Sequence, residues 1–215
     1  FKADSRCRAV QILRADHPLG PFVPHGNGPV TPSDWECLDG TLFVDEGGLP
    51  WMVFCHEWLQ VKNGEMCAVR LAEELDAAIG EPVLLFRATE APWVVPVAKA
   101  PWDIPMEGDD RFVPDGPFLV RSEDGKLLML WSSWGKDGYA IGIAESDSGQ
   151  LFGPWTQQPV PLFGKDGGHG MLFADFANRL LLSIHVPNVH PQERPAFFPV
   201  RWSGGSLCMA DGEAV

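Results

Sequence analysis

The sequence predicts an all-β fold, specifically a β-propeller, from two blocks that repeat along the chain. The first block is a hairpin pattern, in which an apolar run, a turn and a second apolar run follow one another. It occurs at 39–58, 115–134 and 169–185, and a turn such as Asp-Gly between apolar runs is a strong hairpin signal. The second block, clearest at 138–155, is a strand that ends in a Gly-Pro-aromatic turn. Together they give about four strands per period of roughly 50–75 residues, which is typical of a propeller blade.

The composition is that of a globular chain with many short strands. Its 215 residues suffice for one domain, 45% of them are hydrophobic, and 23 Gly and 20 Pro punctuate the strands. The net charge of −13 repels phosphate backbones, so nucleic-acid binding is not expected. No window of 18 apolar residues occurs, so no membrane span is expected either. Nine Trp and 13 Phe suit stacking on sugars, although core packing is the commoner use of aromatic rings.

The cysteines do not form a recognisable framework. There are five of them, an odd number, and none has CxxC spacing. This pattern argues against both a disulfide scaffold and a zinc site.

The chain begins inside the repeat, since residues 8–22 correspond to the second half of a blade. We therefore expect about one and a half further blades, supplied by a missing N-terminal segment or by a second chain. The turn-rich stretch 24–35 is predicted to be a loop before the first complete hairpin at 39–58. Residues 90–110 carry four prolines and are predicted to form a long loop over one face, the kind of segment that is often functional.

The second half of the chain continues the pattern within the same single domain, 1–215. The best-defined blade is predicted at 115–155. A strand at 197–202 is expected to pair with the strand at 179–185, and residues 203–215 are expected to form a Gly-rich, acidic tail.

The three hairpins open alike, with a polar residue followed by glycine. These polar residues are Asp39, Asp115 and His169. Because the first strand of each propeller blade lines the central axis, we expect the three side chains to converge at one place. Two carboxylates and an imidazole at one point could form a catalytic centre. The alternative is that Asp-Gly at a strand start serves only the turn.

The chain resembles family 43 glycoside hydrolases in four segments. These segments are DGTLFVDEGGLPWMVFCHEW, PLGPF, DGPFLVRSEDGKLLMLWSSW and KDGGHGMLF. The resemblance implies a five-bladed β-propeller, of which roughly three and a half blades are present in this chain. It also implies β-xylosidase, α-L-arabinofuranosidase or arabinanase activity with inversion. That family uses three carboxylates, namely an Asp as general base, an Asp that tunes the acid, and a Glu as general acid.

The resemblance assigns roles to residues of this sequence. Asp39 falls on the tuning Asp, and Asp115 falls on the acid, where it is one methylene shorter than the family's Glu. Glu57 and Glu90 are alternative acids, and the general base is expected ahead of residue 1. His169 falls on an axial histidine that supports a central calcium or water cluster, so a structural calcium is possible although no cofactor is required.

The chemistry explains why two adjacent carboxyls are useful. The acid must stay protonated near neutral pH, and a carboxylate close by raises its pKa because like charges disfavour ionisation. In inverting enzymes the acid and the base stand roughly 6.5–9.5 Å apart, which leaves room for the attacking water.

Five further residues are candidates for sugar binding. His56 and Glu57 are expected on a rim of the site, Trp58 and Trp134 end their hairpins at matching positions and could stack on a sugar, and Arg194 matches a sugar-contacting arginine of the resembled family. The alternatives are core packing for the two tryptophans and a surface ion pair for Arg194.

The sequence thus favours a glycoside hydrolase that acts on terminal or internal pentose linkages, with a small or polymeric carbohydrate as substrate. One alternative is a propeller that binds carbohydrate without cleaving it, or with altered activity, because the acid position holds Asp. Another is a related propeller glycosidase acting on galactosides or fructosides. Both a secreted or periplasmic and a cytoplasmic location remain compatible with the sequence.

Overall fold

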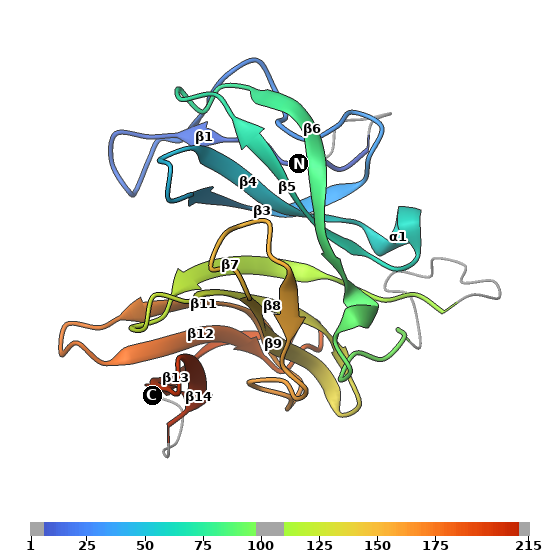
Figure 1. Cartoon of the computed structure of the whole chain (residues 1–215), viewed down its shortest axis with the longest axis vertical. Helices are drawn as coiled ribbons and strands as arrows, with labels where there is room; N and C mark the ends of the chain where they lie inside the picture. Colours follow the sequence, from blue (N-terminus) through green and yellow to red (C-terminus); the bar gives the residue numbers. More distant parts are fainter. Residues whose placement is uncertain (1–6, 98–109, 211–215) are drawn as a thin grey trace.

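The computed structural model describes residues 7–97 and 110–210, and their regular secondary structure is almost entirely β-strand (Figure 1). Twelve of the strands form three four-stranded antiparallel sheets, each in chain order. The first sheet consists of β3 (Cys37–Val44), β4 (Pro50–His56), β5 (Glu65–Leu71) and β6 (Ala78–Arg87). The second consists of β7 (Asp115–Arg121), β8 (Leu127–Gly135), β9 (Gly138–Ser146) and β10 (Trp155–Gln157). The third consists of β11 (Gly168–Ala174), β12 (Leu180–Val186), β13 (Arg194–Ser203) and β14 (Ser206–Met209).

The remaining elements among the described residues are small. Two short strands pair near the N-terminal end, and one helical turn each follows β4 and β6. They are β1 (Leu13–Arg14), β2 (Val23–Pro24), α1 (Trp58–Val61) and η1 (Ala88–Glu90). No helix in the described part of the chain is long and apolar enough to cross a membrane.

The sheets lie face to face in sequence order, as blades of a propeller do (Figure 1). One buried cluster joins the first and second sheets and includes Phe86 and Trp131. A second cluster, which includes Leu130 and Leu182, joins the second and third sheets. Burial of these alternating apolar side chains supplies the main driving force for stacking. The predicted all-β propeller is confirmed, with three complete blades and the two-stranded β1–β2 sheet in the described residues.

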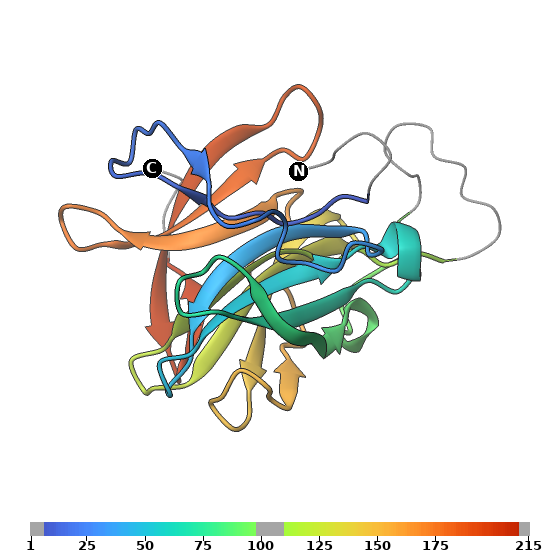
Figure 2. The same ribbon diagram turned by 90° about the horizontal axis from the view of Figure 1, so that it is seen from above.

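The inner strands of the three blades lie next to one another, with β7 in contact with both β3 and β11. Figure 2 shows the same stack from above. A side chain also ties β3 to β7, because the hydroxyl of Thr41 donates to the carbonyl of Pro117 over 2.6 Å. Pro117 is buried, so this bond satisfies an acceptor that water reaches poorly.

We expect Thr41→Val to lower the free energy of unfolding by about 1–3 kcal/mol, because the variant keeps the shape and leaves the Pro117 carbonyl unpaired. Urea unfolding measures the loss. Thr156→Val is the matched control, since the Thr156 hydroxyl bonds Asp147 at an exposed position. Equal stability of the two variants would show that the Thr41 bond does not hold the blades together.

The two predictions for the C-terminal part of the chain have different outcomes. The predicted pairing of 197–202 with 179–185 is confirmed by β12 and β13. The expected tail from residue 203 is wrong in its first part, because β14 pairs with β13 and completes the third blade. The sequence Gly204-Gly205 makes the tight turn between them, with positive φ at both residues. Residues 211–215 lie outside the described residues.

The proline-rich segment 90–110 is described only at its two ends, and residues 98–109 lie outside the described part. Its first residues do not lie on the surface throughout, since Trp93 is buried against Trp131 in the core between blades. A Cβ on Gly142 would come within 2.4 Å of the Trp93 ring. The lack of a side chain at Gly142 therefore lets this part of the segment pack into the core.

Candidate active site

The structure brings Asp39, Asp115 and His169 together at the inner strands. The charge of Asp39 acts on Asp115, so the two carboxyls lie close enough to interact. Oδ2 of Asp39 also accepts a hydrogen bond from the backbone N–H of Gly116 over 3.1 Å. On the far side, Nε2 of His169 lies 3.9 Å from Oδ1 of Asp39. Asp39 is therefore the central member, held between β7 and β11.

The pKa of Asp115 is raised well above its ordinary value of 3.8. Burial is the largest cause, and the charge of Asp39 is the next. The hydroxyl of Tyr139 acts in the opposite direction and lowers the pKa, while the charge of Glu57 raises it further. Burial and the neighbouring charge therefore both favour the protonated form of the Asp115 carboxyl.

Tyr139 is a member of the site that the sequence analysis missed. Its hydroxyl donates to Oδ2 of Asp115 over 2.7 Å, and its side chain is buried at the start of β9. The ring packs edge-on against Trp134, with centroids 5.8 Å apart, and stacks on His185 at 5.5 Å. One signal was available, because this is the only tyrosine in the sequence and it lies directly after the second hairpin.

The register of the inner strands corrects the proposed equivalence of Asp39, Asp115 and His169. Each inner strand has a bulge near its start, and the residue on the bulge has positive φ. This residue is Asp39 (φ 56) in β3, Gly116 (φ 53) in β7 and His169 (φ 54) in β11. Asp115 precedes its bulge by one residue and is instead equivalent to Leu38. The two carboxyls therefore meet from adjacent, non-equivalent positions.

Glycines allow the inner strands to approach closely at this point. A Cβ on Gly116 would lie 2.9 Å from Cδ2 of His169. A Cβ on Gly168 would lie 2.8 Å from Cε1 of Tyr139, and the neighbouring N–H of His169 donates to the hydroxyl of Ser132 over 2.8 Å. Backbone atoms of the glycines, as well as side chains, therefore lie in close contact at this site.

Glu57 and His56 lie nearby but are engaged with protein groups. Glu57 is buried, and its carboxylate pairs with Arg8 over 3.1 Å. Burial raises the pKa of Glu57, although the charge of Arg8 opposes this. His56 is buried and stacks on Trp35, and its two ring nitrogens lie 3.0 Å from acceptor atoms of other side chains. Neither nitrogen is open to a sugar, so the proposed rim position of His56 is wrong.

The other predicted binding residues fall into different environments. Trp58 is buried in a small apolar cluster, and Trp134 packs against that cluster half-buried, where it also contacts Tyr139. Arg194 is exposed, and its guanidinium donates to the carbonyls of the preceding loop. Glu90, the alternative acid, is exposed and accepts the N–H of Arg87. Of these four, only Trp134 reaches the residues around Asp115 through a described contact.

The surroundings of His169 do not fit a calcium site. No group of three or more potential metal-ligating side chains occurs in residues 7–97 and 110–210. Calcium takes six to eight oxygen ligands, whereas His169 offers a nitrogen beside the single carboxylate of Asp39. A structural calcium stays a prediction from the resemblance, and no chemical step below depends on it.

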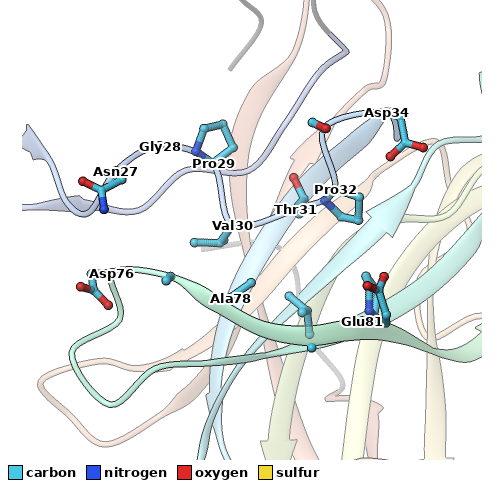
Figure 3. Close-up of a pocket in the computed structure, with 15 residues that line it drawn as sticks. Asn27, Gly28, Pro29, Val30, Thr31, Pro32, Asp34, Asp76, Ala78 and Glu81 are labelled. Atoms are coloured by element: carbon cyan, nitrogen blue, oxygen red, sulfur yellow. The ribbon is translucent and has the colours of Figure 1, made fainter.

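Two cavities border the first blade. One, of about 400 Å³, has Asp39 in its wall, together with Leu38, Gly40 and part of the segment 9–13. The other, of about 480 Å³, lies between the loop 27–34 and the start of β6 (Figure 3). Neither Asp39 nor Asp115 lines this second cavity, and no aromatic ring does. Of these two cavities, the one beside Asp39 borders the carboxyl pair.

A propeller in which two carboxyls meet at the inner strands offers the residue types that glycosidases use. The sequence profile of glycosyl hydrolases family 43 matches residues 1–204. An endo-arabinase from Bacteroides thetaiotaomicron is 46% identical with a TM-score of 0.86, over 95% of this chain and 70% of that chain. The chain therefore belongs to glycoside hydrolase family 43.

More distant structures share the fold. A thermostable family-43 glycoside hydrolase is 19% identical with a TM-score of 0.75, over 97% of this chain and 70% of its own. An endo-1,4-β-xylanase from Bacteroides thetaiotaomicron is also 19% identical, with a TM-score of 0.73, over 96% of this chain and 68% of its own. No curated protein matches the sequence.

Proposed function

We propose that this protein hydrolyses α-L-arabinofuranosyl linkages of arabinan with inversion, Asp115 acting as general acid and Asp39 tuning it. The observation that carries the proposal is the raised pKa of Asp115, which burial and the Asp39 charge cause together. The endo-arabinase at 46% identity supports arabinan as the substrate.

In the proposed reaction, Asp115 gives its proton to the glycosidic oxygen as the bond to the anomeric carbon breaks. The electron pair stays on the leaving oxygen, and a water molecule attacks the anomeric carbon from the opposite face. That water gives its proton to a carboxylate base. Asp39 is not the base in this proposal, because its charge acts on Asp115 at close range and raises the pKa of that carboxyl, whereas an inverting acid and base stand roughly 6.5–9.5 Å apart to admit the water.

A substrate panel with the full-length natural protein tests the proposal. We expect turnover of linear arabinan and arabino-oligosaccharides, with much slower turnover of xylan and aryl xylosides, and we expect proton NMR to show the inverted anomer first. Galactosides and fructosides complete the panel. Turnover of xylan without turnover of arabinan would overturn the proposed substrate, and a retained anomer would overturn the mechanism.

A second function is favoured by one specific feature, the Asp at the acid position, whose carboxyl reaches one methylene less far than a Glu would. A propeller with this change could bind arabino-oligosaccharides without cleaving them. Calorimetry that shows binding, together with no released sugar after prolonged incubation, would favour this alternative over hydrolysis.

A further inference from the structure

The acid proposed above has a partner whose role nothing so far explains. Tyr139 donates to Oδ2 of Asp115 over 2.7 Å from a side chain that is only 3% exposed. A buried hydroxyl needs a hydrogen-bond partner, but any nearby carbonyl could have satisfied it. Here it is directed at the carboxyl of the pair that carries the proton.

The position of the Tyr139 ring is fixed from several sides. His185 stacks on one face, and Nε2 of His185 lies 2.9 Å from the side-chain oxygen of Asn188. Trp134 packs edge-on against the ring, and the bare backbone of Gly168 lies close to Cε1. The backbone carbonyl of Tyr139 also accepts the N–H of Gly167 over 2.8 Å. The hydroxyl can therefore hold Asp115 in one orientation.

We propose that Tyr139 is a positioning residue for the general acid, fixing the plane of the Asp115 carboxyl and stabilising the charge left on it when its proton departs. This inference rests on the proposed role of Asp115. When the proton moves to the glycosidic oxygen, Asp115 becomes a carboxylate beside the carboxylate of Asp39. Because hydrogen bonds to charged acceptors are about twice as strong as neutral ones, the Tyr139 bond strengthens during this step.

The groups that can influence the Asp115 proton come from each neighbouring strand. They are Asp39 on β3, Cys55 on β4, Glu57 after β4, Tyr139 on β9, His169 against Asp39 on β11, and His185 against Tyr139 on β12. Among the side chains with the largest effects on Asp115, the Tyr139 hydroxyl lowers the pKa, whereas Asp39 and Glu57 raise it. Removing the hydroxyl should therefore raise the pKa of Asp115 further.

The test compares Tyr139→Phe with the wild type in the full-length natural protein. We expect kcat on arabino-oligosaccharides to fall roughly 10- to 100-fold, as for the loss of a hydrogen bond to a charged group. The loss on 4-nitrophenyl arabinofuranoside should be much smaller, because nitrophenol leaves without protonation. The basic limb of the pH–rate profile should move up by about one pH unit or more.

A site-specific fluorotyrosine at position 139 keeps the size of the ring and makes the hydroxyl a stronger donor, so we expect the basic limb to move down instead. The pKa of Tyr139 is raised well above 10.0, chiefly by burial, which keeps the fluorinated hydroxyl protonated in the assay. Ser146→Ala is the matched control, because it removes another buried hydroxyl from β9, one that donates to the carbonyl of Gln150. It should leave the profile unchanged.

The outcomes separate this inference from the proposed function. Equal losses on both substrates with an unshifted profile, in a Tyr139→Phe protein of normal melting temperature, would show that Tyr139 is only structural. If Tyr139→Phe does not fold, an unshifted profile for the fluorotyrosine protein overturns the inference in the same way. Full activity of Asp115→Asn on oligosaccharides would overturn the acid assignment itself, and this inference with it.

Discussion

Asp115→Asn in the full-length protein is expected to lose about 10²–10⁴-fold in kcat on arabino-oligosaccharides, the usual contribution of a general acid. The amide keeps the size of the side chain and cannot deliver the proton to the glycosidic oxygen. The same variant should lose far less on 4-nitrophenyl arabinofuranoside, whose leaving group needs no protonation. Initial rates on the two substrates measure the difference.

The matched control for this variant is Asp147→Asn, in the same blade, where the carboxylate is exposed and accepts the Thr156 hydroxyl. It should keep wild-type rates on both substrates. If Asp115→Asn slows the two substrates equally, the residue does not protonate the leaving group, and another group must be the acid.

Asp39→Asn is expected to give the next largest effect and a change of pH profile. The charge of Asp39 raises the pKa of Asp115, second only to burial. Without that charge the pKa of Asp115 falls, so the acid loses its proton at lower pH. The basic limb of the pH–rate profile should therefore move down, and kcat at neutral pH should fall by about tenfold for each unit of the shift.

The same substitution changes how stability depends on pH. The folded-state pKa of Asp115 lies above its unfolded value near 3.8, so the folded protein binds more protons between the two values and this contribution to stability decreases as pH rises through that interval. Asp39→Asn should narrow the interval and flatten the decrease. Urea unfolding across the acidic to neutral range measures this, and an unchanged slope would contradict the described coupling of the two carboxyls.

The blades could be predicted from the sequence because each hairpin carries its own local signals. Apolar runs of strand length, with a turn between them, fix both strands and their pairing. The strand β14 was missed because it is only four residues long and directly follows a Gly-Gly pair, which was interpreted as the start of a tail. The pairing with β13 fixes this strand in the structure. A local sequence pattern does not show with which segment a strand will pair.

The sequence predicted which residues meet at the site better than it predicted how they are arranged. Asp39 and Asp115 both stand in Asp-Gly pairs, yet the bulge falls on the Asp in β3 and on the Gly in β7. A one-residue slip of this kind changes which way side chains point, and the letters alone do not show it. Tyr139 was missed for a related reason, since its contact with Asp115 joins the first and third strands of a blade across the second.

The recurring bulge has a consequence for engineering. Its backbone geometry is the same in three blades while the residue placed on it is an aspartate, a glycine and a histidine in turn. The fold therefore carries three different residue types at one backbone position in successive blades. We expect the bulge position of each inner strand to be the place at which new polar side chains can be introduced near the existing site.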